Sequence, residues 1–223
     1  MTSQVPATTK MQLLRTAERL FARDGIDAVS MRSICAEAGQ RNNAALQYHF
    51  GDKQKLIEAI LEARMKAVDV GRASILERIR SETREHDLYE LVGALIRPFT
   101  AQLCDEKGGG HDYVRFAAQL FSRGNPIELL AARRSWGESF HAIIELIREC
   151  LSDLPEDVVH GRLAMLAAQM VHATAARGAE LARVGGHERE RSVAIFTVDL
   201  VDYMVGGLTA RVSLARGDGG PPC

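Results

Sequence analysis

The side chains best suited to recognising another molecule lie between Gly39 and Lys53. They are amides, a phenol, an imidazole and cations, with no acid among them before Asp52: Gln40, Arg41, Asn42, Asn43, Gln47, Tyr48, His49 and Lys53. Groups of these types hydrogen-bond to phosphate oxygens and to the edges of DNA bases. We therefore interpret the segment as a nucleic-acid contact.

Two short helices are expected to position these side chains. Ser30 is an N-cap candidate for the first, and Gly39 ends it. Leu46 and Phe50 share one face of a second helix over 44–50, so the small, polar and aromatic residues between them face elsewhere. The first helix turns one apolar side inward through Met31, Ile34, Cys35 and Ala38. The pattern predicts a helix-turn-helix whose second helix enters the DNA major groove.

At these residues the chain resembles the tetracycline-repressor (TetR) family of bacterial transcription regulators. The residues that carry the resemblance are LFARDG at 20–25, Ser30, Ile34, the Ala38-Gly39 pair and LQYHFGDK at 46–53. The resemblance implies a three-helix DNA-binding module, an effector pocket in a C-terminal bundle, and a homodimer that reads a palindromic operator. The turn GQRNNAA is one residue longer than the family pattern, so which of Arg41, Asn42 and Asn43 reads a base stays open.

The predicted DNA contacts extend over the whole N-terminal module. Gln47 is expected to bond a base edge or a phosphate, and Tyr48 to bond a phosphate. Lys53 is expected to hold a phosphate at the N-terminus of the next helix. For a tyrosine beside a histidine, the alternative is simple packing at a helix end. The complete predicted set is Lys10, Ser30, Arg32, Arg41, Asn42, Asn43, Ala44, Ala45, Gln47, Tyr48, His49 and Lys53.

Charge is distributed unevenly along the 223 residues, although the formal net charge is only −1. Up to Lys55 there are eight basic and five acidic residues, a net charge of +3, which leaves −4 for the remainder. The sign of this asymmetry is the one that phosphate contact requires. Four scattered cysteines without disulfide or metal spacing indicate a reducing cytoplasm, and no uncharged apolar stretch of membrane-spanning length is evident.

Helical periodicity continues through the rest of the chain, so we predict an all-α protein of about nine helices. A helix-turn-helix domain is expected over 8–53, and a bundle of roughly six helices for ligand binding and dimerisation over 54–216. The tails 1–7 and 217–223 are expected to be disordered. Within the bundle, Asp112 is expected to cap one helix, a single helix is expected from Pro126 to about Leu151, and the last helix over Arg191 to about Leu214.

Aromatic residues gather on three consecutive predicted helices of the bundle. Each is more simply a core residue, but together they suit an apolar cavity for a small molecule. The predicted ligand-binding set is Phe99, Tyr113, Phe116, Gln119, Leu120, Trp136, Phe140, Gln169 and His172. The last two helices are rich in small and apolar residues and are expected to form the homodimer interface.

These features favour a sequence-specific transcriptional regulator, a repressor that a small apolar effector releases from operator DNA. An activator or an effector-free regulator with the same DNA module is the alternative, and a helical enzyme or protein-interaction module is a more remote one. No G-x-S-x-G, glycine-rich phosphate loop or HExxH motif is present. Glu156 and His160 have a spacing that can hold a metal but usually forms a surface pair. We expect no catalytic residue, metal, cofactor or membrane partner.

Overall fold

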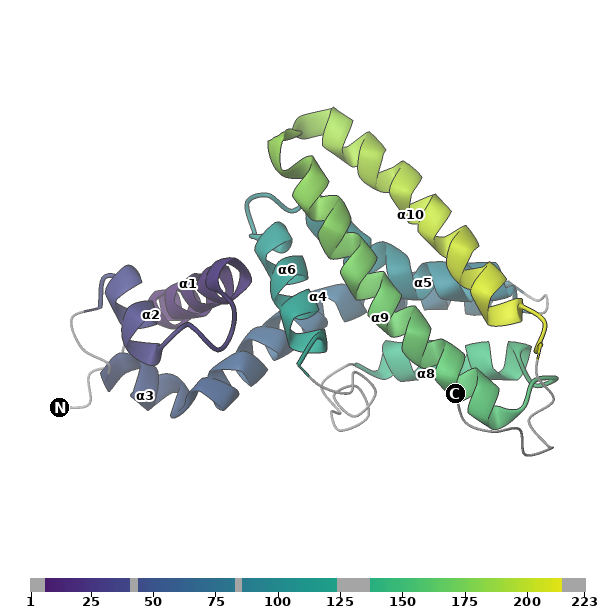
Figure 1. Ribbon diagram of the computed structural model, residues 1–223, viewed down its shortest axis with the longest axis horizontal. Helices are drawn as coiled ribbons and strands as arrows, with labels where there is room; N and C mark the ends of the chain where they lie inside the picture. The colour runs from purple at the N-terminus through teal and green to yellow at the C-terminus, as the bar shows by residue number, and fades with distance from the viewer. Residues whose placement is uncertain (1–6, 41–43, 83–85, 124–136, 214–223) are drawn as a thin grey trace.

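The computed structural model describes residues 7–40, 44–82, 86–123 and 137–213. Within these ranges the chain is entirely helical, as the hydrophobic periodicity predicts, with nine α-helices and two short 3-10 helices (Figure 1). The α-helices are α1 (Ala7–Asp24), α2 (Met31–Glu37), α3 (Ala44–Phe50), α4 (Lys53–Ser81), α5 (Leu88–Thr100), α6 (Gly110–Phe121), α8 (Glu138–Cys150), α9 (Glu156–Glu180) and α10 (Gly186–Thr209).

The first three helices form a small module at one end of the molecule (Figure 1). α1 buries Leu13, Ala17 and Phe21, and α2 and α3 cover them with Ile34 and Leu46. These side chains recur at helical spacing, so each short helix buries one face and leaves the other in solvent. The predicted three-helix module is therefore present.

α4 connects this module with the rest of the chain. Its N-cap is Asp52, whose side chain accepts a hydrogen bond from the backbone N–H of Lys55 at 2.8 Å. With 29 residues it is about 44 Å long at 1.5 Å per residue. Leu56 and Ile60 are buried beneath the N-terminal module, and Met65 to Ile79 continue the buried face into the bundle.

The remaining helices form the predicted C-terminal bundle. α9 and α10 are its longest members and run side by side in opposite directions along one flank (Figure 1). α5 is its most deeply buried helix and packs against α4, α8 and α10. Pro98 lies inside α5, and the chain then continues as a 3-10 helix, Ala101–Cys104.

Three helices have bounds that differ from those expected. Asp112 does not cap α6, because the left-handed Gly109 (φ 76°) precedes the helix, which begins at Gly110. A helix cannot run through Gly137, whose φ of 86° lies outside the right-handed helical region, so α8 begins at Glu138. α10 begins at Gly186 and ends at Thr209, about five residues earlier than predicted at each end.

Two further expectations concern the ends of the chain and membranes. Ala7, assigned to the N-terminal tail, is the first residue of α1. By length and composition alone, α10 could cross a membrane, although a third of its most apolar window (33%) is buried in the protein. A core helix passes the same test, and α10 packs against α5 and α9, so this is weak evidence for a membrane span.

Gly110 offers a test of the close packing at the start of α6. A Cβ atom there would collide with the backbone carbonyl oxygen of Gln102, which cannot move aside as a side chain can. We expect Gly110→Ala to lower the free energy of unfolding by ~1–3 kcal/mol, the usual cost of overpacking. Urea denaturation monitored by circular dichroism measures it.

The matched control is Gly161→Ala in α9, where no atom lies within 4 Å of the added Cβ. This change should instead stabilise the protein by ~0.5–1 kcal/mol, because alanine is the better helix former. Equal stability of the wild type and Gly110→Ala would contradict the predicted collision.

Candidate nucleic-acid interface

α2 is held at its first turn by a reciprocal pair of serine hydrogen bonds. The Ser30 hydroxyl accepts from the backbone N–H of Ser33, and the Ser33 hydroxyl accepts from the N–H of Ser30, both at 3.0 Å. This capping box confirms Ser30 as the N-cap. Gly39, with φ 70°, ends the helix region and begins the turn toward α3. The two helices therefore meet at a defined turn.

α3 presents two very different faces. Leu46 and Phe50 are buried against the module, whereas Gln47 is exposed and Tyr48 is 77% exposed. An aromatic side chain this exposed on a folded helix is available to bind another molecule. The face of α3 predicted to enter the major groove is thus free of the protein's own core.

His49 occupies a less open position than its neighbours. Its ring is half-buried and lies 5.3 Å from the Tyr48 ring, edge to face, and 5.9 Å from the Phe50 ring. The Nε2 atom is buried without a hydrogen-bond partner among the described residues. His49 therefore supports the orientation of Tyr48 in addition to any contact of its own.

Lys53 lies at the first position of α4, as predicted, but is half-buried. Its Nζ lies 3.4 Å from the Asp27 carbonyl oxygen and 5.7 Å from the centre of the Phe21 ring. Burial lowers the pKa of Lys53, while the charge of Asp27 raises it. The side chain thus ties the turn after α1 to α4 and places positive charge beside the helix N-terminus.

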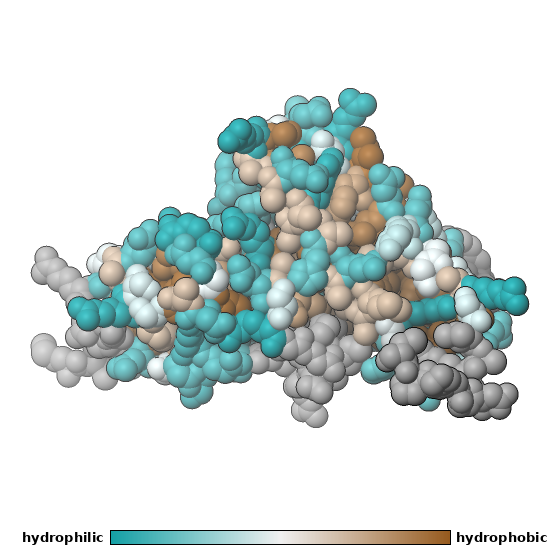
Figure 2. Space-filling view, in the orientation of Figure 1, coloured by the Kyte–Doolittle hydropathy of each residue, from teal (hydrophilic) through white to brown (hydrophobic). Residues whose placement is uncertain are grey.

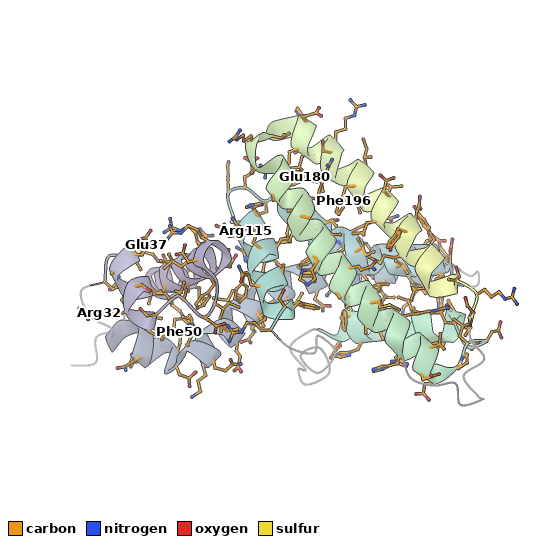
Figure 3. The ribbon with its side chains drawn as sticks, viewed as in Figure 1. Arg32, Glu37, Phe50, Arg115, Glu180 and Phe196 are labelled. Carbon is orange, nitrogen blue, oxygen red and sulfur yellow. The ribbon has the colours of Figure 1, made fainter. Side chains whose placement is uncertain are left out.

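The other predicted DNA contacts are distributed around this surface. Lys10 is exposed, with its Nζ 5.8 Å from the centre of the Phe50 ring. Ser30 and Arg32 are exposed at the start of α2, and Figure 3 shows Arg32 at the outer end of the module, far from the bundle. Arg41, Asn42 and Asn43 lie outside the described residues. Ala44 and Ala45 are in the first turn of α3.

α6 joins the DNA module to the bundle. The ring of Phe116 stacks on that of Phe21 in α1, with centroids 5.9 Å apart and planes inclined by 23°. Just after α6, Arg123 forms an ion pair with Asp27 in the turn between α1 and α2. A displacement of α6 must therefore reach the helices that carry the DNA-contacting face.

A buried ion pair makes a second connection between the two parts. Arg64 of α4 donates to both carboxylate oxygens of Glu18 in α1, at 2.6–3.1 Å. It also donates to the carbonyl oxygens of Gly108 and Gly109, in the loop before α6, at 2.6 and 3.2 Å. Burial raises the pKa of the Glu18 carboxyl, and Arg64 opposes this by hydrogen bonding and charge. One guanidinium thus links α1, α4 and the α6 loop.

An apolar cavity of about 380 Å³ lies mainly between α8 and α9. Leucine, isoleucine, alanine and methionine side chains form most of its wall, and His141, Glu145, Arg148 and His160 supply its polar groups. Its volume is that of a small-molecule site. A separate polar cleft of about 530 Å³ lies between α1 and the loop at 106–109.

The predicted ligand-binding residues are only partly gathered here. Phe140 lines the cavity, and Phe99, Tyr113 and Leu120 line a small gap beside it. Phe116 packs on α1, and Gln119 lies beside Gly25 at the α1–α6 contact. Gln169 and His172 are exposed, because Leu166 and Met170 occupy the inward face of α9. Trp136 lies outside the described residues.

Sequence reasoning missed most of the cavity residues, including a regularly spaced group on α8. His141, Ile144, Glu145 and Arg148 follow one another at helical spacing on α8, and all line the cavity. Their i, i+3 and i+4 spacing was a usable signal, but selecting aromatic residues passed over them. Glu156 and His160 belong to no potential metal-binding group of three or more residues in the described ranges.

Comparison with known proteins identifies the class of this chain. The sequence model of "Bacterial regulatory proteins, tetR family" matches residues 13–60, and that of "Tetracyclin repressor-like, C-terminal domain" matches residues 93–207, about half of the chain. The chain therefore belongs to the TetR family of bacterial transcriptional regulators. Members of this family are DNA-binding regulators and not enzymes.

Individual relatives are more distant. The HTH-type transcriptional repressor AcnR of Corynebacterium efficiens is 29% identical over 91 residues, which are 40% of this chain and 48% of AcnR. The match thus spans about half of that relative. A TetR-family regulator from Shewanella sp. PV-4 shares the fold with a TM-score of 0.52 and 21% identity, over 84% of this chain and 95% of its own.

The Glu18–Arg64 pair can be tested by a double-mutant cycle. Arg64→Met leaves the buried Glu18 carboxylate without its cation, and Glu18→Ala leaves Arg64 with only its carbonyl acceptors and the more distant Asp105. We expect the double variant to lose ~1–3 kcal/mol less stability than the sum of the two single losses. Urea unfolding of the four proteins measures this coupling.

The exposed pair Arg19–Glu37, at 3.0 Å, is the matched control. Its coupling should stay below ~1 kcal/mol, because solvent screens exposed charges. Additive losses at Glu18 and Arg64 would show that the buried contact does not hold α1 to α4.

Proposed function

We propose that this regulator is a cytoplasmic repressor that binds palindromic operator DNA as a homodimer and that a small apolar effector releases. The observation that carries the proposal is the division of α3 into a buried Leu46–Phe50 face and an open Gln47–Tyr48 face. Only the open face can enter a major groove while the module stays folded. The apolar cavity in the bundle gives the effector a place to bind.

Each exposed residue has a role that suits its chemistry. The Gln47 amide can donate and accept at a base edge, which gives sequence preference. The Tyr48 hydroxyl, Lys10 and Arg32 bond phosphates, and Lys53 adds positive charge at the N-terminus of α4. Of the turn residues, Arg41, Asn42 or Asn43 is the further candidate for a base contact.

The proposed dimer interface is formed by α9 and α10. Both carry large apolar side chains in solvent: Met165 is 57% exposed, Ile195 54%, Val198 48% and Tyr203 63%. Hydrophobic atoms are visible along this part of the surface among hydrophilic ones (Figure 2). Pairing two copies through these helices buries this surface and sets two α3 helices at the separation that a palindrome demands.

Release requires that the effector bind one conformation better than the other. The cavity walls come from α5, α6, α8 and α9, and α6 also contacts α1 through Phe116 and Phe21. An effector that displaces α6 shifts the DNA module through this contact and through Arg64. Two recognition helices moved apart in the dimer no longer match successive turns of the operator.

The DNA interface predicts different consequences for two neighbouring residues. Tyr48→Ala should weaken binding to operator and unrelated DNA alike by about tenfold, through loss of a charge-assisted hydrogen bond to phosphate. Gln47→Ala should change which bases are selected from a random DNA pool. Gel-shift titration and sequencing of selected DNA measure the two effects.

Ser74→Ala, an exposed change on α4 outside the proposed DNA and dimer surfaces, serves as the control and should alter neither property. An unchanged base preference in Gln47→Ala would argue against base reading by this residue. If operator binding increases transcription, the protein is an activator instead. If no effector changes operator binding, it is an effector-free regulator.

The dimer proposal predicts that charge on α10 breaks the assembly. The double change Ile195→Glu and Val198→Glu should yield a folded monomer, because two carboxylates would be buried at the interface. Operator affinity should fall with it, since each subunit then reads half a site alone. Sedimentation and gel shift check both results.

Val70→Glu is the matched control, because Val70 is even more exposed, at 66%, but belongs to α4. It should leave a dimer. A double variant that still sediments as a dimer would remove α10 from the interface.

A further inference from the structure

Arg72 is a buried cation in the middle of the protein that forms no ion pair within the described part of the chain. Its side chain lies on α4 and is 0% exposed. The Nε and Nη1 atoms have no hydrogen-bond partner among the described residues, and Nη2 reaches only the Leu95 carbonyl oxygen, at 3.5 Å. A buried guanidinium normally has its five N–H donors satisfied by carboxylates or carbonyls.

The groups around Arg72 do not supply the missing acceptor. The guanidinium lies 5.1 Å from the centre of the Phe140 ring, which offers a π face but no lone pairs. Asp69, one turn earlier on α4, accepts from the backbone N–H of Phe140 at 3.3 Å. Burial lowers the pKa of Arg72 to about 10, although Tyr113 and Asp69 raise it, so the side chain stays charged at neutral pH.

A second donor faces the same place. Tyr113 is 1% exposed, and within the described ranges its hydroxyl donates only to the thioether sulfur of Met65, at 3.5 Å. Sulfur of this kind is a weak acceptor. Tyr113 and Arg72 line one small gap of about 10 Å³, the space of a single water molecule. The Arg72 guanidinium and the Tyr113 hydroxyl are therefore two buried donors beside one gap, without a strong hydrogen-bond acceptor among the described residues.

This gap adjoins the apolar cavity between α8 and α9. Phe121 and Met170 line both spaces. Phe140, which covers the guanidinium of Arg72, is itself part of the cavity wall. A ligand in the cavity thus has one aromatic ring between its end group and the buried cation.

We propose that the effector is an apolar monocarboxylate whose carboxylate pairs with Arg72 and Tyr113 while its hydrocarbon part fills the cavity. This deepens the proposed ligand response by naming the chemical class of the ligand. A planar carboxylate matches the guanidinium fork with two parallel hydrogen bonds. The gap as it stands holds no more than a water molecule, so Phe140 must move to admit the carboxylate, and the largely aliphatic cavity wall suits a hydrocarbon chain or ring.

Such pairing would also connect the ligand to the DNA module through α4. Arg72 and Arg64 belong to the same helix, two turns apart, and Arg64 holds Glu18 of α1. Entry of the carboxylate requires the Phe140 ring to move. Attraction between the carboxylate and Arg72 would then shift α4 toward the ligand. Arg72 would thus be paired only when the ligand is bound, whereas Arg64 is paired with Glu18 in either case.

Calorimetry on the full chain without DNA tests the proposal, with decanoate and decanol as one matched pair and phenylbutyrate and phenylbutanol as another. At least one acid should bind roughly tenfold tighter than its alcohol, the effect expected of charge-assisted hydrogen bonds. Arg72→Met should bring that ratio close to one. Without ligand, Arg72→Met should melt at a higher temperature than the wild type, because an unpaired buried charge is removed.

Arg148→Gln, at the polar end of the cavity, is the matched control and should keep the preference for the acid. If Arg72→Met does not fold, nuclear magnetic resonance of a labelled carboxyl carbon in the bound acid replaces it. The pKa of the bound carboxyl should then lie below that of the free acid, because a guanidinium stabilises the ionised form.

The proposal is overturned if acid and alcohol bind equally, if neither pair binds, or if Arg148→Gln abolishes the preference. The proposal is also overturned if Arg72→Met keeps the preference for the acid, or if binding leaves the pKa of the ligand carboxyl unchanged. Binding that depends on Arg72 but leaves operator DNA bound would contradict the proposed release and uphold the ligand class.

Discussion

The structure depends on one constraint: α4 is a single unbroken helix whose buried face packs in both the DNA module and the bundle. Leu56 and Ile60 pack beneath α1 to α3, and Val68, Leu76 and Ile79 pack within the bundle. A continuous helix is stiff over this length, because each turn is hydrogen-bonded to the next. The DNA module therefore cannot rotate freely against the bundle, and a change at one end of α4 has consequences at the other.

Two arginines on α4 differ in how their charge is compensated. Arg64 is satisfied by Glu18 and by two backbone carbonyls of the α6 loop. Arg72 is more deeply buried and lacks an acceptor of comparable strength. Burying a charge is tolerable when it is paired and costly when it is not. The uncompensated charge on α4 thus lies beside the cavity, where the proposed ligand would pair with it, and not beside the DNA module.

Predictions from sequence succeeded where local chemistry determines the structure. Ser30 and Asp52 accept backbone N–H groups at helix starts, and Gly39 adopts the left-handed conformation, as their residue types favour. The predictions failed where neighbouring residues offered equally good places for a helix to begin. Asp112 is a good cap by composition, but Gly109 before it decides where α6 begins. Gly137 interrupts an apolar pattern that would otherwise suit one continuous helix.

The sequence by itself determined the all-helical class, the helix-turn-helix and the open face of α3, because these follow from spacing within a few residues of one another. Only the tertiary structure decided which bundle residues line a cavity. Gln169 and His172 point to solvent, whereas Leu166 and Met170 of the same helix line the cavity, because packing selects one face of each helix. Nor does spacing show that Arg72 is unpaired: that depends on which acceptors from α5, α6 and α8 come within reach, and these are far apart in the chain.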